Sequence, residues 1–292
     1  MSNRRSLMPV RIVTDSTADI SPQQAQALGI TIIPLTVFFG EDTYLDGTEL
    51  DNVGFYTKLQ ESKVFPRTSQ PSPTVFQEAY IRLIDAGADG ILSVHISSKL
   101  SRTYQCACAA RDTLPDDVKK IPIEIIDSQS VSVGMSQDVL QAAREARSGV
   151  GLEEIKARLL DQLSRTRILG VLDTLEYAKR GGRLGSAAAL LGNQLNIKPI
   201  ISLKDGAVIL VEQPRTRSKA YRLIAQLVSD MGKIEKLVIG ESNEEVGQQL
   251  AQALNTTYQG DISTYKFGAV LGAHGGPGSV AVAVITARKS QE

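Results

Sequence analysis

The sequence predicts an α/β protein of two domains: an N-terminal three-layer α/β/α domain with a parallel sheet and a C-terminal two-layer α/β domain with a mixed sheet. Strand-like and helix-like segments alternate through the first half, which is typical of a parallel sheet with helices on its faces. A hairpin signature in the second half indicates antiparallel strands there. At 292 residues, 42% of them apolar, the chain is about twice the usual size of one domain. We therefore expect domains over residues 1–160 and 161–292.

The N-terminal elements begin with a strand at residues 10–16, where a β-branched run ends in Thr-Asp-Ser. A helix follows at 21–29, because Ser21 can cap it, proline is its first residue and glycine closes it. Residues 30–39 are expected to form a second apolar strand. The next predicted elements are a Ser-capped helix at 72–88, a strand at 90–97, a helix at 100–114 and a strand at 121–128.

Segments rich in hydroxyl groups follow three of these strands. They read TDSTAD at 14–19, HISSKLS at 95–101 and IDSQSVS at 126–132. Open α/β sheets bind their ligands beyond the carboxyl ends of the strands, so we expect a ligand crevice at this edge.

The second half begins with a pair of helices, 137–149 and 151–166, which we expect to join the halves. A hairpin is expected at 198–216, where Lys-Asp-Gly separates two alternating apolar runs. Near the C-terminus, an apolar strand is expected to end at His274. The other predicted elements are strands at 167–173 and 236–242 and helices that run into 177–185 or cover 186–195, 218–231 and 243–256.

Composition and charge narrow the classes of function. Lys plus Arg and Asp plus Glu both number 32, so no excess of positive charge indicates nucleic-acid binding. No apolar run approaches the ~20 residues that cross a bilayer, and the N-terminus lacks an apolar run of signal-peptide length. We expect a soluble, cytoplasmic protein. Cys106 and Cys108 have neither redox nor zinc-site spacing, so we expect small buried residues there and no bound metal or cofactor.

Asp15 follows the first strand, where an aspartate can hold Mg²⁺ or accept a phosphoryl group. No further carboxylates and no phosphate-cradling glycine loop accompany it, so capping of the next turn is the favoured interpretation. His95 lies inside a strand pattern and is interpreted as structural.

Arg183 lies in KRGGRLGS, residues 179–186, whose glycines allow an anion to approach the backbone but lack the spacing of nucleotide loops. A helix C-cap and an anion site built on the Arg183 guanidinium both fit this pattern. His274 precedes three glycines and a proline, which leave its surroundings free of side chains. Structural and functional roles both stay open for His274.

Residues 67–73, RTSQPSP, are expected to form a loop. The nucleophile motif G-x-S-x-G is absent from the sequence, and no nucleophile, base and orienting group assemble from its motifs. Neutral donors at Thr68, Ser69 and the serines of 95–101, with one imidazole and one guanidinium, suit the binding of an anionic head group. Apolar segments nearby suit a hydrophobic tail.

Six motifs, in this order and over nearly the full chain, resemble the DegV family: VTDSTADI, TSQPS, SSKLSRTYQ, IDSQSVSVG, YAKRGGRLG with KPIISLKDG, and AHGGPG. The resemblance implies a two-lobed α/β fold that binds one long-chain fatty acid between the lobes. In some bacteria, family members are the fatty-acid-binding subunit of fatty acid kinase. A separate kinase subunit then uses ATP to phosphorylate the bound carboxylate, and the acyl phosphate enters phospholipid synthesis.

The same resemblance implies roles for individual residues. Thr68 and Ser101 are expected to hydrogen-bond the carboxylate, and Arg183 and His274 to lie near the head group.

Ser69, next to Thr68, and Ser98, in the same HISSKLS segment as Ser101, are further expected contacts. Arg215, in PRTR, matches the arginine implicated in docking the kinase subunit. Arg102 replaces the family's usual glycine, and it either projects to solvent, adds positive charge at the carboxylate or alters docking.

The expected function is that of a carrier for a palmitate-like fatty acid, which presents the acid to a kinase and has no catalytic activity of its own. One alternative is a lipid-linked carrier or regulator without a kinase partner. Another is an enzyme, either a phosphotransferase using Asp15 or a hydrolase using a serine of 95–101.

Overall fold

The computed structural model describes residues 10–116, 118–185 and 197–288, so the helix predicted at 186–195 lies outside the described residues. The N-terminal part holds a four-stranded, all-parallel sheet in the order β2-β1-β6-β7. Its strands are β1 (Arg11–Asp15), β2 (Ile30–Ile33), β6 (Ile91–His95) and β7 (Ile123–Asp127).

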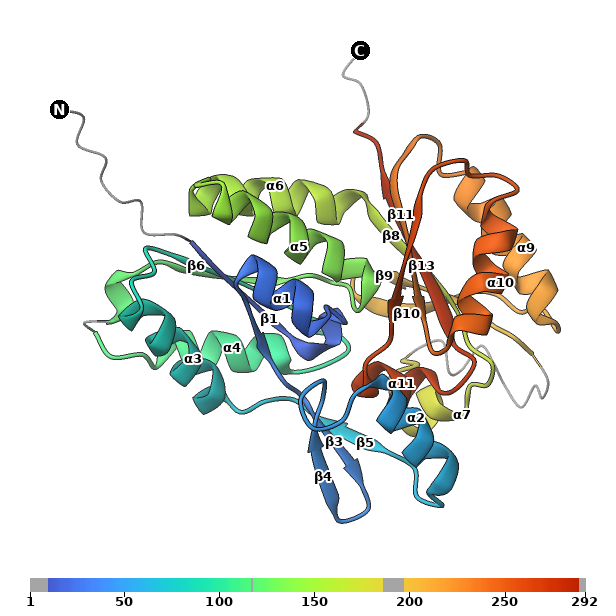
Figure 1. Ribbon diagram of the computed structural model, residues 1–292, viewed down its shortest axis with the longest axis horizontal. Coiled ribbons are helices and arrows are strands. Elements are labelled where there is room, and N and C mark those ends of the chain that lie inside the picture. Colours follow the sequence, from blue (N-terminus) through green and yellow to red (C-terminus); the bar gives the residue numbers. More distant parts are fainter. Residues whose placement is uncertain (1–9, 117, 186–196, 289–292) are drawn as a thin grey trace.

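Helices cover both faces of this sheet (Figure 1). One face packs against α1 (Pro22–Leu28), α5 (Val133–Arg147) and α6 (Leu152–Arg165). The other packs against α3 (Pro73–Asp85) and α4 (Thr103–Asp112). The predicted three-layer α/β/α arrangement is confirmed.

Local chemistry explains how the first helices begin. The Ser21 side chain accepts a hydrogen bond from the Gln24 N–H, and the Gln24 Oε1 accepts one from the Ser21 N–H, so the two residues form a capping box at the start of α1. Gly29 ends α1 with a left-handed backbone, as predicted. Ser72 precedes α3 but makes no side-chain cap, so α3 begins on Pro73 alone.

The single strand predicted at 30–39 is wrong, because the chain changes sheet at Pro34. Proline has no N–H to offer a ladder, so β2 ends before it and β3 (Thr36–Phe39) starts a second sheet. β3 pairs antiparallel with β4 (Asp42–Leu45) and β5 (Arg67–Ser69). Residues 67–69 are therefore a strand rather than part of a loop. Helix α2 (Asn52–Glu61) lies beside this small sheet (Figure 1).

The C-terminal part holds a six-stranded mixed sheet in the order β10-β9-β8-β13-β11-β12, in which β11 and β12 are the parallel neighbours. Helices α9 (Arg217–Ser229) and α10 (Glu244–Leu254) cover one face. The predicted two-layer domain with a mixed sheet is confirmed. Its strands are β8 (Thr166–Val171), β9 (Ile200–Lys204), β10 (Ala207–Glu212), β11 (Ile234–Glu241), β12 (Ile262–Lys266) and β13 (Val280–Thr286).

The predicted hairpin is β9–β10, and Asp205 and Gly206 form its turn with φ of 51° and 79°. Positive φ at both central positions matches the twist of the strands, which is why Asp-Gly is favoured there. β12, whose sequence ISTYK alternates weakly, was not predicted.

The strand predicted to end at His274 is wrong, because residues 269–275 form the helix α11 (Ala269–Gly275) and β13 begins only at Val280. Gly276 ends the helix with φ of 73°. α11 packs into the apolar cluster of β3 and α2, against Val37 and Phe55, so a C-terminal helix fills an N-terminal core.

The predicted helical pair corresponds to α5 and α6, which pack on the N-terminal sheet. The predicted boundary between residues 160 and 161 falls inside α6, and the division into domains stays a prediction. Within the described ranges, no helix combines the length and apolar character that a bilayer crossing requires.

Candidate functional site

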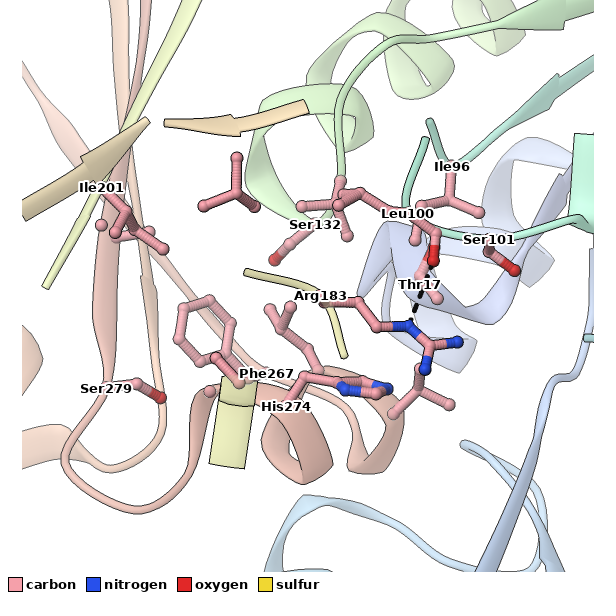
Figure 2. A pocket seen from close by; sticks show the side chains of 18 of the residues that line it. Thr17, Ile96, Leu100, Ser101, Ser132, Arg183, Ile201, Phe267, His274 and Ser279 are labelled. Carbon is pink, nitrogen blue, oxygen red and sulfur yellow. Dashed lines mark hydrogen bonds between the residues drawn. The ribbon is translucent and has the colours of Figure 1, made fainter. Parts of the chain in front are cut away.

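A largely apolar cavity lies where the two halves meet, and both halves contribute to its walls. Among the described residues that line it, Arg183 is the one side chain with a full charge. Figure 2 shows Arg183, His274 and Ser101 toward one side of the cavity and Ile201 toward the opposite side. The apolar walls include Leu172, Ile201, Leu203, Val208, Phe267 and Val280.

A hydrogen bond joins Thr68 and His274 at the polar end of the cavity, which is the side where Arg183, His274 and Ser101 lie. Thr68 lies on β5, and its Oγ1 is 2.8 Å from the His274 Nε2 in the last turn of α11. Burial, together with the nearby charge of Arg183, lowers the pKa of His274 to about 4. The imidazole is therefore neutral at physiological pH.

The proton of this neutral imidazole is best placed on Nε2. His274 Nδ1 is buried without a hydrogen-bond partner among the described residues. A buried N–H without an acceptor costs more than a bare acceptor nitrogen, so we assign the proton to Nε2, which donates to Thr68 Oγ1. The Thr68 hydroxyl is then free to donate its own proton to a ligand in the cavity.

Ser101 and Arg183 come from opposite halves and meet at the same end. Ser101 precedes α4, where its Oγ accepts from the Thr103 N–H at 3.3 Å and lies 2.8 Å from Thr103 Oγ1. Arg183 Nε donates to the Leu100 carbonyl at 3.3 Å, and a second guanidinium nitrogen donates to the Gly181 carbonyl. Partial burial lowers the pKa of Arg183 without neutralising it. Arg183 thus holds positive charge beside two hydroxyls and an imidazole.

Two glycines allow this packing. A Cβ on Gly181 would lie 2.2 Å from His274 Nδ1, and one on Gly276 would lie 2.3 Å from the Tyr177 ring. Tyr177 belongs to α7 (Glu176–Arg180), so α7 and α11 approach through glycine on both sides. The glycine that leaves room for the His274 imidazole is therefore Gly181 of the KRGGRLGS motif.

Of the other predicted residues, one lines the cavity and three do not. Ser69 lines the cavity beside Thr68, whereas Ser98 is not among its lining residues, and the Ser98 N–H donates to Asp127 at 3.1 Å. Arg215 is exposed between β10 and α9, away from the cavity lining. Arg102 is exposed at the N-cap of α4 and does not line the cavity.

Five polar lining residues were not predicted from the sequence: Thr17, Gln70, Ser132, Ser202 and Ser279. Ser132 adopts an unusual backbone, with φ of 55° and ψ of −134°, and donates to Asp19. Thr17 and Ser132 belong to the hydroxyl-rich strand ends that were expected to face a ligand. The sequence signal located the segments but not the side chains that point inward.

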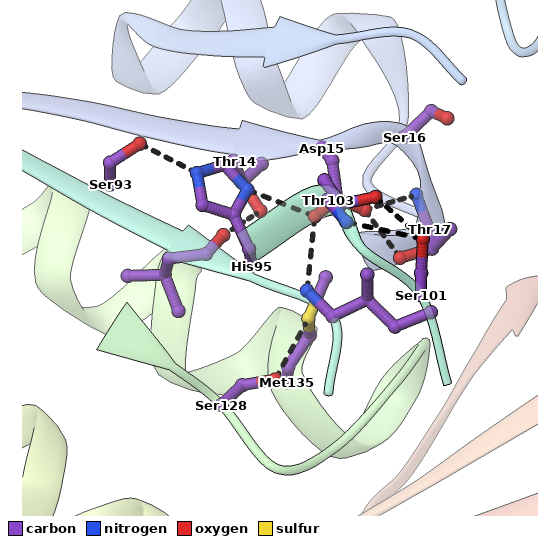
Figure 3. Close-up of polar contacts among 12 residues, drawn as sticks. Thr14, Asp15, Ser16, Thr17, Ser93, His95, Ser101, Thr103, Ser128 and Met135 are labelled. Carbon is purple, nitrogen blue, oxygen red and sulfur yellow. Dashed lines mark hydrogen bonds and ion pairs between the residues drawn. The ribbon is translucent and has the colours of Figure 1, made fainter. Parts of the chain in front are cut away.

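A second polar cluster is structural (Figure 3). Asp15 Oδ2 is 3.0 Å from His95 Nδ1, and His95 Nε2 is 2.7 Å from Ser93 Oγ. This order resembles a hydrolytic triad, but Ser93 is fully buried and also bonds the Tyr80 hydroxyl at 2.9 Å. Asp15 Oδ1 bonds Thr17, so both carboxylate oxygens are occupied, and the structural interpretation of Asp15 and His95 is supported.

Across the part of the chain that the structure describes, no group of three or more His, Cys, Asp or Glu side chains is arranged to hold a metal ion.

Comparisons with known proteins identify the family of this chain. The chain is 35% identical to a DegV domain-containing protein of Halalkalibacterium halodurans over 93% of this chain and 96% of that protein. Its structure is similar to that of a fatty-acid-binding DegV family protein of Thermus thermophilus, with a TM-score of 0.86 and 31% identity. The match covers 96% of this chain and 100% of that protein. A stearic acid-binding protein of Eubacterium ventriosum gives a TM-score of 0.87 at 26% identity, with coverage of 95% and 98%. The family model described as "Uncharacterised protein, DegV family" matches residues 9–287. The chain therefore belongs to the DegV family.

Proposed function

We propose that this protein binds one long-chain, palmitate-like fatty acid between its two halves and carries no catalytic activity alone. The carboxylate is held by Thr68 and Ser101, with Ser69, Arg183 and His274 close by. The observation that carries the proposal is the cavity itself: its walls are mostly apolar, and Arg183, the one charged side chain among the described residues that line it, lies at the polar end.

The energetics of such a ligand are consistent with the cavity. About fourteen buried CH₂ groups at ~0.8 kcal/mol each offer on the order of 10 kcal/mol before binding entropy is subtracted. A buried carboxylate without partners would be prohibitively costly. The tail therefore supplies affinity, while the hydroxyls and Arg183 fix the orientation.

We further propose that the bound acid is presented in the cytoplasm to a separate ATP-dependent kinase subunit, which forms the acyl phosphate. Arg215 supports this step, because it is exposed on the C-terminal half and free of the cavity. A carrier or regulator without a kinase partner uses the same cavity and differs only in what consumes the ligand. A pull-down with the purified, lipid-loaded chain that captures no ATP-dependent kinase would favour the second role.

The enzyme alternatives have less support. The Asp15 carboxylate is fully engaged inside the fold, and the triad-like Ser93 has no access to solvent. Ser98 and Ser101 have no histidine partner among their hydrogen bonds in the described ranges.

Lipid extraction of the purified protein followed by mass spectrometry tests the proposal. We expect a fatty acid of roughly C14 to C18, and Thr68→Val together with Ser101→Ala should lower the affinity for palmitate at least ten-fold, about 1.4 kcal/mol. Thr31→Val, on β2 and outside the cavity, is the matched control and should bind as the wild type does. A protein that carries no lipid and takes up none when offered palmitate would refute the function.

A further inference from the structure

Helix α11 connects the head-group site to a pair of buried aspartates. Its last turn carries His274, which contacts Thr68. At its other end, the Gly268 N–H donates to Asp19 Oδ1 and the Ala269 N–H donates to Asp46 Oδ1, both at 2.8 Å. The short helix is therefore fixed at one end and carries a head-group residue at the other.

The aspartates are a costly way to cap a helix. Asp46 is 2% exposed, and its Oδ2 has no hydrogen-bond partner in the described part of the chain. Burial raises the pKa of Asp46 to about 6 and that of Asp19 well above its ordinary value. A helix start ordinarily has a single capping side chain, so two desolvated carboxylates on consecutive N–H groups indicate a demand for accurate placement.

A displacement of the first turn of α11 would also move His274 at the head-group site, because the helix is short and packs tightly against α2. Ala269 and His274 are five residues apart, about 8 Å along a helix. A Cβ on Gly272, midway between them, would lie 2.5 Å from the Phe55 ring, so the helix lies directly on α2. Asn52, also on α2, donates to the Phe267 carbonyl at 2.6 Å and fixes the approach to the helix.

We propose that Asp19 and Asp46 are positioning residues of the head-group site: by holding the first turn of α11 they set the His274 imidazole against Thr68. The consequence for ligand affinity rests on the proposed function. The placement of His274 does not, because it can be measured in the ligand-free protein.

The test compares Asp46→Ala, which removes the acceptor for Ala269, with Asp46→Asn, which keeps an oxygen there. Asp51→Ala is the matched control, because Asp51 caps α2 through the Gly54 N–H at 2.8 Å and does not bond α11. The chain has two histidines, so His274→Gln identifies the His274 signal in an NMR pH titration. The dissociation constant for palmitate is measured on the same variants.

In Asp46→Ala, the pKa of His274 should rise from about 4 toward its ordinary value and the dissociation constant for palmitate should rise at least ten-fold. In Asp46→Asn and Asp51→Ala, the dissociation constant for palmitate should stay within about two-fold of the wild-type value, and the pKa of His274 should stay within about half a pH unit. Should Asp46→Ala fail to fold, Asp19→Ala tests the same coupling through Gly268 and carries the same expectations.

The inference would be overturned if Asp46→Ala kept the wild-type pKa of His274 and the wild-type dissociation constant for palmitate. It would also be overturned if Asp46→Asn changed these two quantities as much as Asp46→Ala does. A wild-type protein that does not bind palmitate would instead overturn the proposed function, while the His274 titration would still decide the inference.

Discussion

At the scale of single residues, Gly181 controls whether His274 can occupy its place. Gly181→Ala would put a methyl group 2.2 Å from His274 Nδ1, so the imidazole must move away from Thr68. We expect the affinity for palmitate, measured by calorimetry, to fall at least ten-fold, about 1.4 kcal/mol.

Gly182→Ala is the neighbouring control for this variant. A Cβ on Gly182 meets no atom within 4 Å, although its φ of 70° makes alanine cost about 1 kcal/mol of folding free energy. Gly182→Ala should therefore lose stability but keep affinity. Equal losses of affinity in the two variants would show that backbone strain, and not contact with His274, is responsible.

Asp138 on α5 predicts a pH-dependent stability. It is 1% exposed, neither carboxylate oxygen has a partner in the described ranges, and burial raises its pKa to about 7, although Gln162 and the charges of Arg165 and Lys236 partly oppose this. The folded state binds this proton more tightly than the unfolded chain does. Its contribution to stability is therefore present below pH ~4 and lost as pH rises through about 7.

Asp138→Asn cannot ionise, so its advantage over the wild type should grow between pH 4 and 8 by on the order of 3 kcal/mol, as measured by urea unfolding. The exposed Asp261→Asn serves as control and should show no such trend. A stability difference for Asp138→Asn that does not change with pH would contradict the prediction.

At the scale of elements, the β9–β10 hairpin forms a cavity wall that is tied to the N-terminal half at its tip. Ser97 Oγ donates to the Gly206 carbonyl at 2.7 Å and accepts from the Lys99 N–H at 3.1 Å. Ile201 and Val208, on the two strands of the hairpin, line the cavity.

Ser97→Ala removes this tie and leaves the buried Gly206 carbonyl without its donor. We expect a loss of about 1–3 kcal/mol in the free energy of unfolding and several-fold faster dissociation of bound palmitate, measured by stopped-flow exchange. Ser229→Ala, at the exposed end of α9, should change neither. Unchanged dissociation in Ser97→Ala would mean that the hairpin tip does not retain the ligand.

Elements with local signals were predictable from the sequence, and those set by distant contacts were not. The Ser21 cap of α1 and the Asp-Gly turn of β9–β10 are encoded within a few residues and are confirmed. The strand predicted to end at His274 is instead α11, because the side chains that hold its first turn lie more than 200 residues away. Short β5 gave no pattern, because a three-residue strand depends on β3 for its pairing.

At the scale of the whole molecule, the site depends on which side chains converge from different sheets. The family resemblance supplied Thr68, Ser101, Arg183 and His274, and the structure places all four at the cavity. Ser98 was included for its closeness in sequence to Ser101, but it is not among the residues that line the cavity. Closeness in sequence does not determine which side chains face a cavity, so this part needed the three-dimensional arrangement.

Because both halves line the cavity, a fatty acid that fills it should stabilise the entire fold. Binding to the folded state alone contributes about 2.7 kcal/mol at a free concentration of 100 times the dissociation constant. For 292 residues this corresponds to a rise in Tm of about 4 °C, measurable by calorimetry.

Octanoate has eight fewer CH₂ groups than palmitate, which removes about 6 kcal/mol of burial, so at the same concentration it should leave Tm unchanged. Methyl palmitate keeps the tail but lacks the carboxylate that Thr68 and Arg183 would bind, so its shift should be smaller than that of palmitate. Equal shifts for palmitate and octanoate would show that the tail does not occupy the apolar cavity.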